Sequence, residues 1–335
     1  MTSAAPERAP SVPLEENADG GLSGSLRTRL RDPGNLVLLA VLVVAIIVGA
    51  STPRFFSIEN AKAICASTGT IGIAALGVTL IMVCGGLVSL AVGETAAVSG
   101  MVFLTTLGLG LVPALLAATA AAAVVTGIQG WAIGAWRANP IILTIAVGSI
   151  LTSIGARMSS TKAVSPASDA FEHLNKTPLG VPVVVFALLG LTVLVQLLMS
   201  TTRLGRLMYA VGENRAAAVA AGLPVAWTVA CGFVAAGALM AISGAFSAAS
   251  SHTITLEGAN QLTFNAIAAV LAGGTSIAGG FGSATRTLFG ALMIATISDL
   301  LLLRGAEVGT QTLVKGLLVL VVVLLGHVRS RRSRT

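Results

Sequence analysis

The sequence predicts an all-α membrane protein with about ten transmembrane helices, some of them broken by glycine. Its 335 residues are 55% hydrophobic and only 10% charged, whereas about 25% of the residues in a soluble domain are charged. Ten separate apolar runs approach or exceed the length needed to cross a hydrocarbon core of about 30 Å. Basic residues cluster beside these runs, which marks membrane sides rather than a nucleic-acid surface. The composition therefore excludes a soluble class and argues against a nucleic-acid partner.

The chain divides into a transmembrane domain and two polar tails. Residues 1–34 are rich in Pro, Ser and acidic residues, which is typical of a disordered tail. The transmembrane domain is expected over 35–327, and 328–335 form a short basic C-terminal tail. A cleavable signal peptide is not expected, because the basic start and the A-x-A site are both missing.

The transmembrane helices are expected at the apolar runs 35–51, 63–84, 87–108, 111–133, 140–158, 180–199, 223–245, 264–278, 286–303 and 311–327. The run 264–278 is short for a full crossing, so it is expected to be a broken or re-entrant piece. Only Cys-Gly-Gly separates 63–84 from 87–108, so that break is expected at membrane depth.

The distribution of basic residues predicts a plasma-membrane protein with both termini in the cytoplasm. With ten spans, twelve basic residues lie on the cytoplasmic side: Arg27, Arg29, Arg31, Arg137, Arg203, Arg206, Arg215, Arg286, Arg329, Arg331, Arg332 and Arg334. Six lie outside: Arg54, Lys62, Arg157, Lys162, Lys176 and Arg304. This bias follows the positive-inside rule.

The stretch LAGGTSIAGGFGS, residues 271–283, holds five glycines between apolar runs. Backbone groups that leave a helix inside a bilayer need a partner in protein or water. Gly273, Gly274, Thr275 and Ser276 are therefore candidates to line a polar path, and close helix packing through small residues is the alternative. The stretch has no lysine and so no Walker A motif. The chain is not expected to hydrolyse ATP itself.

Glu94 lies in a second glycine-broken segment, CGGLVSLAVGETAAVSG. A charge at the bilayer centre costs about 2.5–3.5 kcal/mol, so Glu94 is expected to face the bundle interior or to lie near the membrane surface. The Ser89 and Thr95 hydroxyls are candidates to bind a polar solute, or to bond the carbonyl four residues earlier. Asp299 is expected either to pair with Arg304 or to act as a second functional acid.

The polar segment 200–222 contains a short Ala-rich helix around Ala217. Gly212 precedes it, Glu213 is expected in its first turn, where an acid suits the helix dipole, and Gly222 ends it. Such a helix is marginal alone in water. It is either a docking element for a partner or a plain connector. No metal ligands cluster, and the three cysteines lie singly in apolar runs, so no metal or cofactor is expected.

Two motifs carry a resemblance to the permease subunits of bacterial ABC importers, the family of the ribose, xylose and galactose permeases. TRLGRLMYAVGENRAAAVAAG resembles the family pattern TRLGR-x-x-x-A-x-G-x-N-x-x-A-A-x-x-x-G. The residues on this pattern that the resemblance implies for ATPase coupling are Arg203, Gly205, Arg206, Gly212, Asn214, Ala217 and Gly222, with Glu213 beside them. NAIAAVLAGGTSIAGGFGS resembles DAIAAVVLGGTS-x-x-GG-x-G.

A third stretch, GLVSLAVGE, resembles G-x-x-DLSVGS with departures. Ser89 replaces Asp, Ala91 and Glu94 replace Ser, and Asn265 replaces the Asp before AIAAV. Asn265 joins the candidates for the translocation path. The resemblance implies two permease copies, identical or different, a separate ATPase subunit and an extracytoplasmic solute-binding protein.

The function expected from the sequence is inward transport of a small polar solute such as a sugar. Three alternatives stay open: an ABC permease for nucleosides or branched-chain amino acids, a proton-coupled transporter that uses Glu94 and Asp299, and a membrane scaffold without solute flux.

Overall fold

The computed structural model describes residues 47, 49–85, 87–159, 171–251, 254, 256 and 258–332. The elements follow in the order α3 (Ile58–Val83), α4 (Val92–Thr106), η1 (Leu107–Leu109), α5 (Leu111–Trp136), α6 (Pro140–Ser159), α7 (Glu172–Asn175), η3 (Pro178–Gly180), α8 (Val183–Thr201), α9 (Arg203–Glu213), α10 (Arg215–Ala220), α11 (Val225–Ser251), α12 (Ala259–Ala272), α13 (Ala284–Leu303) and α14 (Val308–Arg332). The predicted all-α class is confirmed.

The helices correspond to the predicted apolar runs. Seven of them are long and apolar enough to cross a membrane: α3, α4 with η1, α5, α6, α8, α11 and α13. Two shorter apolar helices, α12 and the first part of α14, account for the runs 264–278 and 311–327. The run 35–51 and the tail 1–34 lie largely or wholly outside the described residues, as does Gly86. Residues 328–332 continue α14, so this helix extends into the stretch predicted as a tail.

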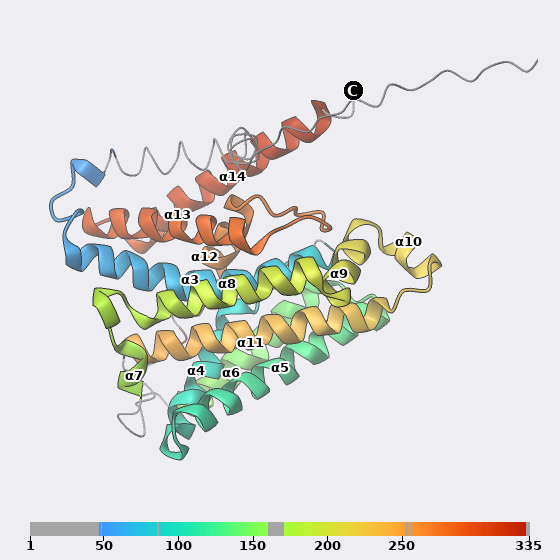
Figure 1. The fold of residues 1–335 in the computed structure, drawn as a ribbon, viewed down its shortest axis with the longest axis horizontal. Coiled ribbons are helices and arrows are strands. Elements are labelled where there is room, and N and C mark those ends of the chain that lie inside the picture. The colour runs from blue at the N-terminus through green and yellow to red at the C-terminus, as the bar shows by residue number, and fades with distance from the viewer. Residues whose placement is uncertain are drawn as a thin grey trace, which may run out of the picture.

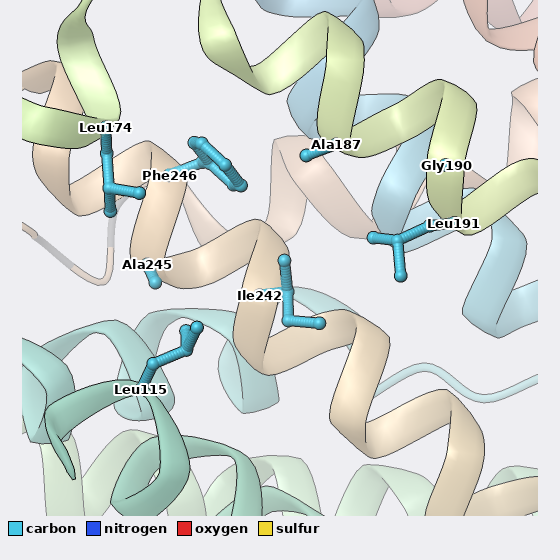
Figure 2. Close-up of a pocket in the computed structure, with 8 residues that line it drawn as sticks. All are labelled: Leu115, Leu174, Ala187, Gly190, Leu191, Ile242, Ala245 and Phe246. Atoms are coloured by element: carbon cyan, nitrogen blue, oxygen red, sulfur yellow. The ribbon is translucent and has the colours of Figure 1, made fainter. Parts of the chain in front are cut away.

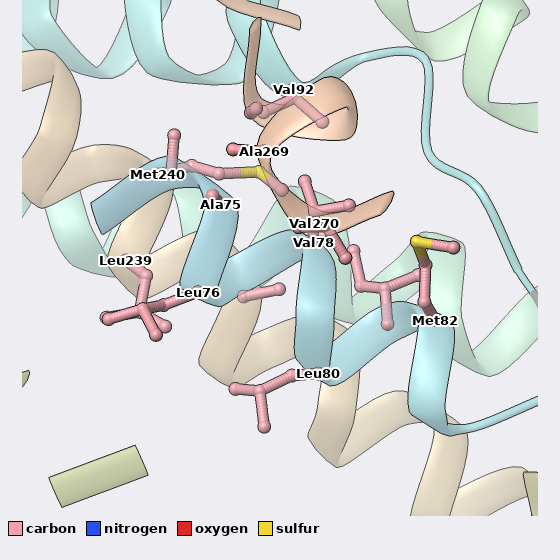
Figure 3. Packing of buried hydrophobic residues seen from close by; sticks show 14 of the residues in the cluster. Ala75, Leu76, Val78, Leu80, Met82, Val92, Leu239, Met240, Ala269 and Val270 are labelled. Atoms are coloured by element: carbon pink, nitrogen blue, oxygen red, sulfur yellow. The ribbon is translucent and has the colours of Figure 1, made fainter. Parts of the chain in front are cut away.

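Helix α3 forms the centre of the bundle. It begins at Ser57, whose side chain accepts a hydrogen bond from the Asn60 N–H, as a helix cap does. Every residue from Ile71 to Val83 is buried, and the apolar residues on all sides of α3 suit a helix surrounded by others. Figure 3 shows this core, with Leu76 and Leu80 of α3 near α11 residues such as Leu239 and with Val270 of α12 beside Val78.

Helices α5 and α11 pack closely along a row of small residues. Lipid tails are as apolar as leucine, so helices in a membrane associate mainly by close van der Waals packing. Small buried residues recur every four positions on one face of α5: Ala114, Ala118, Ala122, Thr126, Gly130 and Gly134. A Cβ atom on Gly130 or Gly134 would press against the α11 backbone at Ala230 or Ala226. The two helices therefore run antiparallel at short distance.

The outer face of the bundle is apolar, as expected for a surface in contact with lipid. Large exposed side chains on α5, α6 and α8 include Leu116, Ile128, Ile142, Val193 and Leu194. Buried positions on α5 and α6 carry mostly small residues, whereas those on α8 include Leu188 and Met199. This inversion of the soluble pattern agrees with the seven candidate spans.

The two ends of the bundle differ in structure. Figure 1 shows α7 at one end and the pair α9 and α10 at the other, with α10 projecting beyond the long helices. Three exposed tryptophans, Trp131, Trp136 and Trp227, lie near the C-terminal end of α5 and the adjoining start of α11. Tryptophan favours the membrane–water interface, so the end that carries α9 and α10 is expected at such an interface.

Candidate functional site

A polar cavity of about 540 Å³ lies between α4, α6 and α12. Its lining mixes apolar side chains with one carboxylate, three hydroxyls and one amide: Leu90, Glu94, Ile145, Gly148, Ser149, Thr152, Asn260, Thr263, Phe264 and Ile267. Ser149, Thr152 and Asn260 are exposed. Polar side chains are rarely placed against lipid, so this face is expected to meet water, solute or a second protein surface.

The break between α3 and α4 places Glu94 on this cavity. α3 ends at Val83 and α4 begins at Val92, so the described residues 87–91 lie outside a helix. Neighbouring helices supply partners, as a bilayer interior requires. The Leu90 N–H donates to Thr144 Oγ1 of α6 at 3.2 Å, and the Gly93 N–H donates to Thr263 Oγ1 of α12 at 2.8 Å. Helices α6 and α12 thus hold the start of α4, whose first turn carries Glu94.

Glu94 is 9% exposed, and its Oε2 atom has no hydrogen-bond partner among the described residues. Gly148 of α6 lies beside the carboxylate, because a Cβ added there would be 3.8 Å from the Glu94 carboxyl carbon, an ordinary van der Waals contact. The expectation that Glu94 faces the interior of the bundle agrees with this placement. An unpaired buried oxygen beside a cavity is a group available to a ligand.

Ser89 and Thr95 are buried but bond locally. The Ala91 N–H donates to Ser89 Oγ at 3.4 Å, and Thr95 Oγ1 donates to the Ala91 carbonyl at 2.6 Å. Neither residue lines the cavity. Of the eight residues predicted for a translocation path, Glu94 alone lines it, and the role of the others stays a prediction.

Asn265 has a partner that the sequence analysis missed. Its Oδ1 atom accepts from Lys315 Nζ of α14 at 2.9 Å, and Lys315 is fully buried. The two residues are fifty positions apart, and no local pattern links them. The only available signal was a lysine within an otherwise apolar run, where a charge needs a named partner.

Gly273, Gly274, Thr275 and Ser276 begin a non-helical turn that joins α12 to α13. Gly274 and Gly280 adopt φ of 80° and 68°, a left-handed conformation that glycine adopts without strain. The Thr275 hydroxyl is buried without a hydrogen-bond partner among the described residues. The Gly280 N–H donates to the Val83 carbonyl at 3.1 Å, so this turn directly contacts the start of the break before α4.

Helix α9 connects the same two breaks to the exposed end of the bundle. Tyr209 Oη donates to the Gly282 carbonyl at 2.8 Å. A Cβ on Gly212 would overlap the Val83 carbonyl oxygen, so glycine permits this close approach. Gly205 similarly packs against the last turn of α8. Gly205 and Gly212 are buried anchors of α9, whereas Arg203 and Arg206 are exposed.

Two details of the segment 200–222 were predicted wrongly. The sequence predicts one Ala-rich helix with Glu213 in its first turn, but Glu213 is the last residue of α9. Asn214 separates the helices, and its side chain accepts from the Ala217 N–H at 3.0 Å to cap α10. Helix α9 was missed because two glycines lower its helix propensity and it contains no long apolar run. Ala217 and Gly222 are exposed, as are most α10 residues.

Asp299 and Arg304 bond to different partners from those expected. Asn60 Nδ2 of α3 donates to Asp299 Oδ2 at 2.8 Å. Arg304 donates to the hydroxyls of Thr52 and Ser51 at 3.1 and 2.9 Å. Both residues thus tie α13 to the start of the described chain, which gives Asp299 a structural contact.

A second cavity, of about 390 Å³, is lined only by apolar residues of α5, α7, α8 and α11. Figure 2 shows Leu191 of α8, Ile242 and Phe246 of α11 and Leu115 of α5 around it. It offers a polar solute no hydrogen-bonding group. The cavity that contains Glu94 is therefore the better candidate for a solute site.

Comparisons with known proteins identify relatives along most of the chain. A family described as "Branched-chain amino acid transport system / permease component" matches residues 60–324. A probable ABC transporter permease protein of Sinorhizobium fredii is 30% identical over 99% of this chain and 99% of the relative. The ribose import permease protein RbsC of Escherichia coli is 31% identical over 87% of this chain and 92% of the relative. The L-arabinose transport system permease protein AraH of Escherichia coli is 28% identical, over 90% and 92%. No solved structure matches the chain.

Proposed function

Because the chain belongs to the family of branched-chain amino acid transport system permease components, we propose that it is the membrane permease subunit of an ATP-binding cassette importer. Its solute is a small polar compound, a sugar or sugar-like molecule, which is the class that the names of the ribose and arabinose relatives indicate. The chain transports and does not hydrolyse ATP.

One structural observation carries this proposal. Helix α9 contacts both non-helical breaks, through Tyr209 at Gly282 and through Gly212 at Val83. One break leads into α4 and the other ends α12, and these two helices line the Glu94 cavity. A push on α9 and α10 is therefore passed to the walls of the cavity through short backbone contacts. Alternating access in a packed bundle needs such a connection between the ATPase contact and the solute cavity.

The partners follow from this arrangement. An ABC ATPase subunit docks on α10 in the cytoplasm, an extracytoplasmic solute-binding protein delivers solute at the other end, and a second permease copy completes the channel in the bilayer. Arg203, Arg206, Arg215 and Arg286 lie at or near the α9 end of the bundle, and by the positive-inside rule they support a cytoplasmic position for that end. Both termini are then cytoplasmic in a bacterial plasma membrane.

Replacement of Ala217 by tryptophan tests the docking role. Ala217 is exposed on α10, so the bulky ring is expected to leave the bundle intact and to block a groove-bound helix. Co-purification of the ATPase and ATP-driven uptake should each fall about tenfold or more, because a single clash of this kind costs over 1.4 kcal/mol. The measurement is pull-down of the ATPase, followed by uptake in vesicles.

The matched control is Ala121→Trp, at an exposed position on α5 away from α10. This variant should keep both activities. Wild-type co-purification and uptake by the Ala217 variant would overturn the assignment of α10 as the docking element.

The family description favours a second candidate, a permease for branched-chain amino acids. Uptake of radiolabelled ribose, arabinose and leucine by the same vesicles decides between the solutes. ATP depletion should abolish uptake in either case. Uptake that survives ATP depletion and stops when the proton gradient is removed would instead establish a proton-coupled transporter.

A further inference from the structure

We propose that the Glu94 cavity selects a solute with a positively charged nitrogen, such as an amine-bearing polyhydroxy compound. This inference rests on the proposed transport function and names the chemical class of its solute. It is carried by the Glu94 Oε2 atom, which has no hydrogen-bond partner among the described residues, by the absence of a basic group among the described lining residues, and by the hydrogen-bonding state of two neighbouring hydroxyls.

The described lining of the cavity carries an acidic residue and no basic one. Among the described residues that line it, Glu94 is the sole ionisable one. Lys315, the nearby buried lysine of α14, is hydrogen-bonded to Asn265 and does not line the cavity. A buried carboxylate without a partner is unfavourable, and a bound cation would remove that cost.

Two of the three hydroxyls in the lining, those of Ser149 and Thr263, have engaged protons, and Thr263 Oγ1 also accepts from the Gly93 N–H. Ser149 Oγ donates to the Ile145 carbonyl at 3.0 Å, and Thr263 Oγ1 donates to the Ala259 carbonyl at 3.1 Å. With their protons engaged, these oxygens can offer a ligand only lone pairs. An ammonium group has three donors and no acceptor, so it matches this lining better than a carboxylate or phosphate does.

The remaining lining suits the rest of such a solute. The Asn260 amide can both donate to and accept from hydroxyl groups, and Phe264 and Ile267 offer an apolar face. A volume of about 540 Å³ is within the range of small-molecule sites. A monosaccharide-sized amine therefore fits in size as well as in polarity.

The helix dipole offers a simpler role for Glu94, since an acid in the first turn of α4 is stabilised by the helix N-terminus. That dipole is equivalent to about half of a positive charge. A full negative charge on Glu94 would therefore leave the cavity negative. A purely capping role at the N-terminus of α4 and a cation-binding role then differ in whether the cavity prefers cations. The capping role predicts that the cavity has no preference for cations, and the proposal predicts a strong preference.

The test measures that preference at Ser149→Cys, in a full-length chain whose Cys65, Cys84 and Cys231 are replaced by alanine. The importer complex is reconstituted and treated with cationic trimethylammonioethyl methanethiosulfonate or with anionic sulfonatoethyl methanethiosulfonate. Each rate of reaction with the thiol at position 149 is divided by the rate of the same reagent with a small thiol in solution. The corrected ratio of the cationic to the anionic reagent is expected to be at least about ten. Glu94→Gln should bring the corrected ratio close to one.

Ser153→Cys is the matched control, because Ser153 is exposed on α6 but does not line the cavity. Its ratio should not respond to Glu94→Gln. Glucosamine is the ligand probe: it should slow labelling at position 149 with Glu94 present, and glucose should protect much less. A ratio near one with Glu94 present, or equal protection by the two sugars, would overturn the inference.

ATP-driven uptake of ribose and arabinose in the same vesicles is scored separately. Uptake of an uncharged sugar together with a corrected ratio near one would refute the cation site and leave the permease function intact. A strong, Glu94-dependent ratio without ATP-driven uptake of any solute, glucosamine included, would support the site and count against the importer.

Discussion

Replacement of Gly93 by valine is expected to prevent the recovery of a folded permease. Gly93 lies in the first turn of α4, and a Cβ atom there would overlap the carbonyl of Ala259 at the start of α12. The Gly93 N–H is also held by Thr263 at 2.8 Å, so the backbone has little room to move away. Overpacking of a tight site costs about 1–3 kcal/mol and occasionally more, and a clash with backbone belongs at the upper end. The measurement is the yield of monodisperse protein in detergent and its thermal midpoint.

Gly190→Val is the matched control for this prediction. Gly190 lies on the exposed side of α8, with nothing within 4 Å of the position that its Cβ would take. Valine is a slightly better helix former than glycine, so this variant should match the wild-type protein or exceed its thermal midpoint. If the two valine variants behave alike, the close contact between α4 and α12 does not limit stability.

Replacement of Asn265 by leucine is expected to produce the second large loss. Lys315 is fully buried, and Asn265 Oδ1 is its hydrogen-bond acceptor. Removal of one member of a buried polar pair leaves the other uncompensated, at a cost of about 3–5 kcal/mol where a charge is involved. The free energy of unfolding, measured by titration with a denaturing detergent, should fall by an amount in this range.

Lys315→Met should have a much smaller effect, because it removes the buried amine and keeps an unbranched apolar stem of similar length. The double variant, with leucine at 265 and methionine at 315, should recover most of the loss, since apolar replacement of a whole buried pair is often neutral. A double variant as unstable as Asn265→Leu alone would show that Asn265 acts through something other than Lys315.

The sequence predicted the membrane-spanning helices well because the bilayer imposes one rule on every span. An apolar run of sufficient length is enough to locate a helix such as α5, whatever its neighbours are. The short run at 264–278 was expected to be broken, and α12 does end at Ala272 before the glycine-rich turn. Helix α9 was not found, because it contains no long apolar run that would mark a span. Its two glycines also lower its helix propensity, so the segment is easily taken for a loop.

The site could be predicted only in part, because most of it comes from contacts between distant segments. Glu94 stood out as an acid in an apolar run, and it does face a cavity. Thr263 and Asn260 of α12 are far from it in sequence, and nothing local indicates that they meet α4. Ser149 and Thr152 of α6 did carry a signal, since residues three apart lie on one helix face.

The single extended residue between α9 and α10 has a consequence for how this permease can change in evolution. Asn214 leaves no slack between the two helices, so the direction of the exposed alanine face is set by an exact residue count. Each residue of an α-helix turns the chain by about 100°. Inserting or deleting one residue within α9 after Gly212 would rotate that face away from the proposed ATPase contact while leaving the helical content almost unchanged. We therefore expect the segment from α9 to α10 to evolve by substitution at constant length. Permease subunits from different importers should be exchangeable only where the lengths of this segment agree.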